Sequence, residues 1–297
     1  MIVTREIGDE NLAKVYIGKI GGHAVEFAES VQPPLLRAEK WVLIVSCLFG
    51  CPVKCLMCDA GQAFRGKLTK GQVLEQIDHM VLRRFPDRKI PVKKFKIQFA
   101  RRGEPALNPA VLDALEELPS LYDAPGLLPV VSTVGPKGCE GFFKRLASIK
   151  NRLYKGGRFQ LQFSIHTSDR EKRDKLIPIP KMDFDEIARY GAGFYRKGDR
   201  KITLNFIVME NFPIDPAVVR QHFDPEHFLI KLTPLNPTGK ARSSGLTTKL
   251  DPGNPDSVSG LIQSFQDLGY DTILSIGETG ENAIGSNCGQ FISSADQ

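Results

Sequence analysis

The chain has no apolar run long enough to cross a membrane, and it contains no internal repeat or low-complexity tract. Its beginning does not read as a secretory signal, so we expect a cytoplasmic protein whose six cysteines remain reduced thiols. A strong excess of one charge is also missing, because a formal net charge of +6 is too small by itself to indicate nucleic-acid binding. With 41% apolar and 25% charged residues, the composition is that of a soluble globular protein.

Three of the cysteines stand close together in the run GCPVKCLMC, residues 50–58. Cys51, Cys55 and Cys58 have the spacing C-x3-C-x2-C, which offers three thiolates on one tight loop. A 4Fe–4S cluster has four iron atoms that each take a soft ligand, so three cysteines leave one iron open to a further molecule. This triplet is typical of radical S-adenosylmethionine (SAM) enzymes, in which the open iron binds the amino and carboxylate groups of SAM.

Zinc is the main alternative occupant of the cysteine loop. Zinc usually takes four ligands from two paired halves, and no second half follows closely; the next histidine, His79, falls in an expected helix. Cys47 offers a competing triplet with Cys51 and Cys55, but its final gap is wrong for the cluster. We therefore place Cys47 outside the cluster and favour the 4Fe–4S interpretation.

Buried strands and amphipathic helices alternate along most of the chain. The patterns predict strands at 41–46, 95–100, 129–133, 159–165, 202–208, 228–232 and 271–275. They predict helices that begin at Thr69 and Asn108, and further helices near 139–149, 183–195, 215–221 and 255–268. Six strand–helix units in this order indicate an α/β protein whose parallel sheet curls into a partial (βα)6 TIM-like barrel.

Shorter segments flank or interrupt the expected barrel. Residues 14–20 and 24–27 look like a small hairpin. The polar loop 235–257 is either a mobile substrate loop or an ordinary surface loop. The expected domains are an N-terminal β hairpin extension at 1–40, a radical SAM barrel at 41–277 and a C-terminal tail at 278–297.

Polar motifs follow several of the expected strands, at the edge where a barrel of this kind carries its catalytic residues. These positions are Gly103 and Glu104 after the second strand, Ser132 at the end of the third, Ser164 and His166 at the end of the fourth, and Asn236 after the sixth. One such match would be weak evidence, whereas several in register along one barrel indicate a common site.

With these motifs the chain resembles the RlmN/Cfr family, radical SAM enzymes that methylate an adenine carbon in RNA. The matching segments are GCPVKCLMC at 50–58, LTKGQVLEQI at 68–77, GEPALN at 103–108, STVG at 132–135, SIHTSDREKRDKLIPI at 164–179, LTPLNP at 232–237 and NCGQ at 287–290. The resemblance implies a 4Fe–4S cluster and SAM as cofactors, an rRNA or tRNA substrate, and a reducing protein such as flavodoxin or ferredoxin as a partner.

The resemblance also implies a role for each matching residue. The cluster would be held by Cys51, Cys55 and Cys58. SAM would be bound by Gly103, Glu104, Ser132, Ser164, His166 and Asn236. Cys288 would accept a methyl group from SAM and pass it to adenine by radical chemistry, and Glu29 would contact that adenine.

The family pattern breaks at three places. Ile44 stands where the family has the cysteine that resolves a protein–RNA crosslink, so Cys47 or Cys139 would have to replace it. Met57 stands where an aromatic side chain is common. Only about forty residues precede the first barrel strand, fewer than the RNA-gripping accessory domain of the family needs.

Two alternative functions stay open on the sequence alone. Arg101 and Arg102, just before the Glu104 motif, would bind a phosphate or carboxylate if they are not paired with Asp59 or Glu104. That possibility favours an enzyme of the same lineage acting on a smaller, non-RNA substrate. An electron-transferring Fe–S protein is the remaining alternative, but it has no use for SAM-binding residues.

Overall fold

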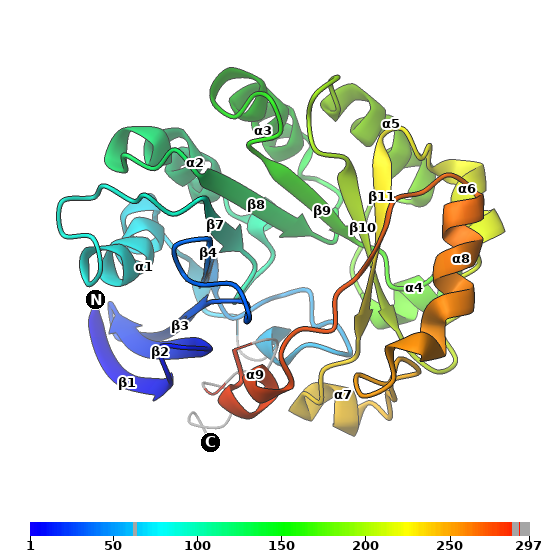
Figure 1. The fold of residues 1–297 in the computed structure, drawn as a ribbon, viewed down its shortest axis with the longest axis horizontal. Helices are drawn as coiled ribbons and strands as arrows, with labels where there is room; N and C mark the ends of the chain where they lie inside the picture. Colours follow the sequence, from blue (N-terminus) through cyan, green and yellow to red (C-terminus); the bar gives the residue numbers. More distant parts are fainter. Residues whose placement is uncertain (62–63, 287–290, 292–297) are drawn as a thin grey trace.

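The computed structural model describes residues 1–61, 64–286 and 291 (Figure 1). One sheet dominates the structure, with ten strands in the order β1-β2-β3-β4-β7-β8-β9-β10-β11-β12. From β4 to β12 all neighbouring strands are parallel, as the alternation of strands and helices predicted. The α/β class and the curled parallel sheet are therefore those expected from the sequence.

The barrel strands fall close to their predicted positions. They are β4 (Lys40–Val45), β7 (Lys94–Phe99), β8 (Leu127–Thr133), β9 (Gln160–Ser164), β10 (Ile202–Val208), β11 (Phe228–Pro234) and β12 (Thr272–Leu274). A separate short pair, β5 (Leu48–Phe49) and β6 (Gly66–Lys67), flanks the cysteine loop.

Helices cover the outer face of this sheet (Figure 1). The larger ones are α1 (Lys70–Leu82), α2 (Ala110–Leu121), α3 (Glu140–Leu153), α5 (Phe184–Phe194), α6 (Pro216–His222) and α8 (Ser259–Asp267). Three short helices, α4 (Arg170–Leu176), α7 (Gly239–Ser243) and α9 (Thr279–Ile284), were not predicted. Short 3-10 turns occupy Asp59–Gly61, Pro105–Leu107 and Pro255–Val258.

Local sequence explains where two of the helices begin. Thr69 caps α1 as predicted, in a capping box with Gln72 in which each side chain bonds the other's backbone N–H. The predicted cap of α2 is only partly right. Asn108 accepts from the N–H of Ala110, but its amide group donates to the carbonyl oxygens of Cys47 and Leu68, so it also ties the cysteine loop to the barrel.

The N-terminal region differs from the predicted hairpin. It has three antiparallel strands, β1 (Ile2–Gly8), β2 (Ala13–Ile20) and β3 (His23–Ser30), and β3 pairs with β4. The mostly exposed β1 has a weak apolar pattern, which is why the sequence did not reveal it. Helix α9, near the C-terminus, lies against β2, so this last helix packs on the N-terminal strands beside the barrel (Figure 1).

Side chains alternate across each barrel strand between the helices outside and the barrel interior. In β7, Phe95, Ile97 and Phe99 are buried in the core under the helices, while Lys94, Lys96 and Gln98 on the other face are half-buried. The barrel interior is thus polar, and the apolar core lies between sheet and helices. Within the described residues, no helix has the length and apolar character that a membrane crossing requires.

Candidate active site

A cavity of about 380 Å³ opens at the carboxyl ends of the parallel strands. All nine residues predicted to bind the cluster or SAM line this cavity, namely Cys51, Cys55, Cys58, Gly103, Glu104, Ser132, Ser164, His166 and Asn236. They come from the carboxyl-terminal ends of strands, as Ser132 and Ser164 do, or from the loops that follow the strands. Their convergence is the main structural fact about the site.

The cysteine loop is shaped by backbone contacts rather than by regular structure. Positive φ angles at Gly50 (81°) and Lys54 (58°) turn the chain sharply on either side of Cys51. The N–H of Leu56 donates to the carbonyl of Leu176 (3.0 Å), which fixes the loop to the end of α4. This arrangement points all three cysteines toward one space.

The donor set suits a multi-iron cluster. Within the described residues, no three His, Cys, Asp or Glu side chains are grouped to hold a single metal ion. A 4Fe–4S cluster binds each cysteine through a different iron atom, so its ligands do not need to meet at one point. Three soft thiols around one cavity are the type of ligand that a 4Fe–4S cluster takes.

Asp59 joins the cysteine loop to the loop that follows β11. Its two carboxylate oxygens accept from the N–H groups of Gly239 (3.1 Å) and Lys240 (2.7 Å), at the start of α7. The Thr238 hydroxyl donates to the carbonyl of Met57 (2.9 Å). The part of loop 235–257 nearest the cavity is therefore held against the cysteine loop, which argues against a freely mobile substrate loop there.

Glu104 is buried at the cavity with its carboxylate held by three donors. One oxygen accepts from the Ala106 N–H (3.0 Å) and the Thr133 hydroxyl, and the other accepts from the Val134 N–H (2.9 Å). Burial raises the pKa of Glu104 to about 6, against the opposite effect of these three hydrogen bonds. A carboxylate has about four acceptor positions, so one remains for a cationic ligand.

Gly103 precedes this carboxylate in a conformation that requires glycine. Its φ is 99°, and a Cβ atom there would lie 2.4 Å from Cγ of Leu48. Any side chain would therefore displace β5, which leads into the cysteine loop. The predicted Gly-Glu motif thus has a steric cause as well as an electrostatic one.

His166 has its ring orientation fixed by the backbone. Its Nδ1 accepts a hydrogen bond from the Ile207 N–H (3.2 Å), so the proton of the neutral ring is on Nε2. Burial, with a contribution from the nearby Arg173, lowers the pKa of His166 to about 3. At neutral pH the ring is therefore an uncharged Nε2–H donor at the edge of the cavity.

Two buried polar atoms of the cavity wall have no partner. Within the described residues, neither Oγ of Ser132 nor Oδ1 of Asn205 makes a hydrogen bond, although both are shielded from solvent. An unpaired buried polar atom is costly, and in native proteins it usually meets a ligand or an ordered water. These atoms mark where a polar ligand such as SAM would bind.

Asn205 was missed in the sequence, together with other polar residues inside the barrel. Gln98, Gln162 and Lys231 also line the cavity, each from the middle of a strand rather than from its end. One sequence pattern could have identified these residues. It is the alternation of polar and apolar residues within strands that are predicted to be buried, as in TLNFIV at 203–208.

Glu29 does not reach the cavity. Its carboxylate is buried and accepts from the hydroxyl of Tyr16 (2.6 Å), the indole N–H of Trp41 (2.7 Å) and the guanidinium of Arg84 (2.9 and 2.7 Å). Those donors fill its acceptor positions and tie β3 to β2, to β4 and to the turn that follows α1. Glu29 therefore has a structural position and is not among the cavity-lining residues.

Cys47 also lies apart from the cavity, whereas Ile44 lines it. Cys47 is fully buried in the apolar core, where burial raises the pKa of its thiol well above the usual value. Cys139, which precedes α3, is not among the cavity-lining residues either. Of these three residues, Ile44 on β4 is the one that lines the cavity.

Arg101 takes part in a buried ion pair that sequence reasoning did not foresee. It pairs with Glu26 on β3 rather than with Asp59 or Glu104, and it also donates to the carbonyl oxygens of Gly285 (2.6 Å) and Ser286 (2.7 Å). Cys288, the predicted methyl carrier, lies outside the described residues.

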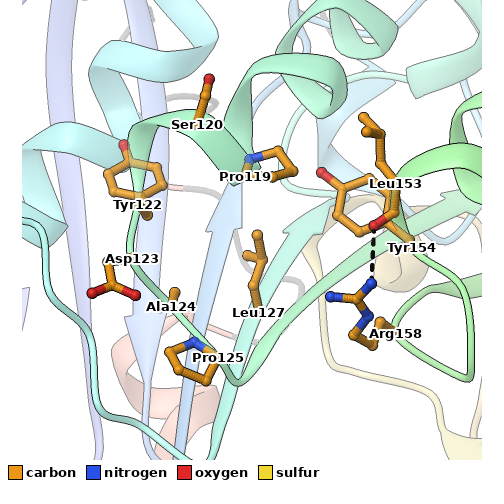
Figure 2. A pocket seen from close by; sticks show the side chains of 10 residues that line it. All are labelled: Pro119, Ser120, Tyr122, Asp123, Ala124, Pro125, Leu127, Leu153, Tyr154 and Arg158. Carbon is orange, nitrogen blue, oxygen red and sulfur yellow. Dashed lines mark hydrogen bonds between the residues drawn. The ribbon is translucent and has the colours of Figure 1, made fainter.

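A second cavity, of about 410 Å³, lies at the opposite end of β8 (Figure 2). Two of its polar side chains have protein partners: the Tyr122 hydroxyl donates to Asp78 (2.7 Å), and Arg158 donates to the carbonyl of Leu153 (3.4 Å). None of the sequence motifs reaches it, and we assign it no function.

Known proteins similar to this chain point to one family. A probable dual-specificity RNA methyltransferase RlmN from Pseudothermotoga lettingae is 28% identical over 203 residues, covering 65% of this chain and 54% of the relative. Another RlmN from Chlorobaculum tepidum is 24% identical over 276 residues, covering 90% and 68%. The chain is thus similar to RlmN RNA methyltransferases, in agreement with the resemblance seen in its sequence motifs.

The solved structures agree on the fold of this RlmN-like protein. A radical SAM methyltransferase from Sphaerobacter thermophilus has a TM-score of 0.74 at 18% identity, covering 97% of this chain and 80% of that one. SuiB from Streptococcus suis, bound to SAM, has a TM-score of 0.54 at 14% identity, covering 79% and 50%. No family model matches the chain. The chain spans about half the length of the first curated relatives it matches.

Proposed function

We propose that this RlmN-like protein is a radical SAM methyltransferase that moves a methyl group from SAM, through Cys288, to a carbon of an RNA adenine. The observation that carries the proposal is the convergence of the cluster and SAM motifs, spread from Cys51 to Asn236, on one cavity. The RNA substrate rests on the relatives, which are named as RNA methyltransferases.

The cofactors of the proposal are a 4Fe–4S cluster on Cys51, Cys55 and Cys58, and SAM beside it. When bound, they supply one-electron chemistry that side chains alone lack, with electrons from an external reductant such as flavodoxin or ferredoxin. Burial raises the pKa of Cys51 to about 11, so these thiols carry protons until a metal displaces them.

The other cavity residues bind and orient SAM in this proposal. Glu104 presents its remaining acceptor position to the ammonium group of the methionine moiety. The Nε2–H of His166 donates to an acceptor oxygen of the ligand, and the unpaired atoms of Ser132 and Asn205 complete the polar contacts. Met57 and Val134 supply apolar cavity surface.

The methyl-carrier role of Cys288 is supported by what holds the chain on either side of it. Arg101 binds the carbonyl of Ser286, and the second oxygen of Glu26 accepts from the N–H of Phe291 (2.9 Å). Arg101 also lines the cavity. One buried ion pair thus holds Ser286 and Phe291, the described residues on either side of 287–290.

The smaller-substrate alternative loses one of its supports. It relied partly on Arg101 as a group that would bind phosphate or carboxylate, and Arg101 is engaged by Glu26 and by two backbone carbonyls. We therefore retain the RNA methyltransferase as the main proposal.

The test begins with protein reconstituted anaerobically with iron and sulfide. We expect a 4Fe–4S cluster, SAM binding, an S-methyl group on Cys288 by mass spectrometry, and methyl transfer to bulk rRNA or tRNA. The Cys288→Ala variant should keep the cluster and cleave SAM with an added reductant, yet transfer no methyl group. Stoichiometric zinc without iron, or RNA methylation by Cys288→Ala at the wild-type rate, would refute the proposal.

A further inference from the structure

Two loops at the amino ends of neighbouring strands lie in contact. Residues 154–159 lead from α3 into β9, and residues 195–201 lead from α5 into β10, the next strand of the sheet. The guanidinium of Arg200 donates to the carbonyl of Gly157 (2.8 Å), and this hydrogen bond joins the two loops. The candidate active site lies at the carboxyl ends of the same strands, with Ser164 at the end of β9. The two loops are therefore on the opposite side of the barrel from that cavity.

These loops carry five exposed cations, which we call the basic surface: Lys155, Arg158, Arg196, Lys197 and Arg200. Arg158 donates to the backbone carbonyls of Lys155 (3.2 Å) and Leu153 (3.4 Å). Hydrogen bonds of this kind, like that of Arg200, position a guanidinium group without cancelling its charge. Across the described part of the chain, none of the five cations forms an ion pair with a carboxylate. All five charges can therefore act on an external anion.

The acids in and around the basic surface leave it positively charged. Asp199, the acid within the two loops, pairs with the buried Lys150 of α3. Figure 2 shows Asp123 and Arg158 on different sides of the second cavity, and no ion pair joins them. The loop before β11 adds two acids that form no ion pair with the basic surface, as far as the structure describes the chain: Asp224 and Glu226. Five unpaired cations on two touching loops exceed these acids.

Phosphates of a nucleic acid fit the basic surface better than a protein partner does. Stable protein interfaces have an apolar centre surrounded by polar groups. The large exposed apolar side chains of the described residues all lie elsewhere, at Ile2, Leu35, Leu36, Phe64, Leu82 and Ile273. Lysine and arginine bind the phosphates of RNA without reading its bases, and such contacts need no apolar centre.

We propose that the basic surface binds the phosphate backbone of the substrate RNA, on the side of the barrel opposite the cavity. This inference rests on the RNA substrate of the proposed function and adds a second region where that RNA is held. The seven residues of β10 alone span roughly 23 Å, so the depth of the barrel separates the two regions. A folded RNA larger than the barrel can contact both regions at once.

The RNA affinity of the cluster-loaded protein tests the basic surface. The probe is bulk rRNA and tRNA, titrated by filter binding at several salt concentrations. The test variant combines Lys155→Gln, Arg196→Gln and Lys197→Gln, whose side chains make no hydrogen bond within the described residues. We expect it to bind RNA at least about tenfold more weakly at low salt, and the salt dependence to fall by about one counterion per lost phosphate contact.

The matched control combines Lys144→Gln, Arg189→Gln and Arg220→Gln. These exposed cations lie on the outer helices α3, α5 and α6, and they form no ion pair in the described part of the chain. The control variant has the same net charge as the test variant, so an effect of overall charge appears in both. Equal loss of RNA affinity in the two variants would overturn the proposal.

A second measurement uses the wild-type protein, so it does not depend on how a variant folds. Limited acetylation followed by mass spectrometry should modify Lys155, Lys197 and Lys144 in the free protein, because all three are exposed. Bulk RNA should protect Lys155 and Lys197 and leave Lys144 unchanged. Equal labelling with and without RNA would contradict the proposal. Protection by an acidic polypeptide such as polyglutamate, but not by RNA, would assign the surface to a protein partner and would also overturn it.

The outcomes for the basic surface and for the proposed function are separable. S-methylation of Cys288 in the wild-type protein tests the methyl-carrier role and involves no RNA. RNA binding that is equal in the wild type and the test variant overturns the basic surface alone. Loss of binding in the test variant, together with an unmethylated Cys288, keeps the surface and refutes the methyl carrier. No RNA binding by the wild type refutes the basic surface and the RNA substrate together.

Discussion

Arg101 and Glu26 form a fully buried ion pair that anchors the chain on both sides of residues 287–290. The pair joins the loop after β7 to the N-terminal sheet and, through backbone groups, to the C-terminal segment. Three parts of the chain that are distant in sequence therefore meet beside the cavity at the strand ends, which Arg101 lines. The N-terminal sheet thus helps to hold the described residues that flank the proposed methyl carrier.

The first prediction concerns that anchor. Arg101→Lys keeps the charge but loses the planar fork that binds Glu26 and two carbonyl oxygens together. We expect S-methylation of Cys288 to fall at least about tenfold, since several charged hydrogen bonds hold the segment. SAM binding and reductive SAM cleavage should stay near the wild-type level, as measured by calorimetry and by 5′-deoxyadenosine formation.

Arg84→Lys is the control for this first prediction. Arg84 pairs with Glu29 in the same N-terminal sheet but does not line the cavity. It should lower the melting temperature without changing Cys288 methylation. If both variants lose methylation in proportion to their stability, Arg101 has only a structural role.

The second prediction uses the unpaired atoms of the cavity wall. Ser132→Ala and Asn205→Leu remove polar atoms that have no partner within the described residues, so no protein hydrogen bond is lost at those atoms. We expect the stability of the SAM-free protein to be unchanged or higher, whereas SAM affinity falls by about 1 kcal/mol or more per lost hydrogen bond. Chemical denaturation and SAM titration measure the two effects separately. A loss of stability with unchanged SAM affinity would contradict the assignment.

Much of the site was predictable because it follows from local sequence and one topological rule. Motifs after successive parallel strands must meet at one edge of the sheet, so the loop of Cys51 and the Glu104 motif were brought together correctly. The boundaries of the barrel strands also followed from apolar runs between helices of regular period. Each of these motifs and apolar runs spans only a few neighbouring residues of the sequence.

The contacts that were not predictable join distant parts of the chain. Arg101 lies 75 residues from Glu26 and 184 from Gly285, and no pattern in the sequence links such positions. Glu29 shows the converse difficulty. Its position along the chain suggested a contact with the substrate. In the structure, Trp41 and Arg84 donate hydrogen bonds to its carboxylate. Only the three-dimensional structure reveals those partners.

The last prediction concerns the thiol that would release product from the methyl carrier. Ile44 lines the cavity, whereas Cys47 is buried in the apolar core and Cys139 lies off the cavity wall. In the proposed function, wild-type protein should therefore accumulate a crosslink between Cys288 and RNA, visible as a slowly migrating band on a denaturing gel. Ile44→Cys places a thiol at the cavity wall and should reduce this band while raising the number of turnovers.

Two variants complete the test of Ile44. Ile44→Val changes the volume at this position without adding a thiol, so the crosslink should persist. Cys47→Ala should leave the crosslink unchanged, because burial keeps that thiol protonated and away from the cavity. If the wild-type protein instead turns over without any crosslink and Cys47→Ala traps one, Cys47 is the resolving residue, and the core around it must open during the reaction.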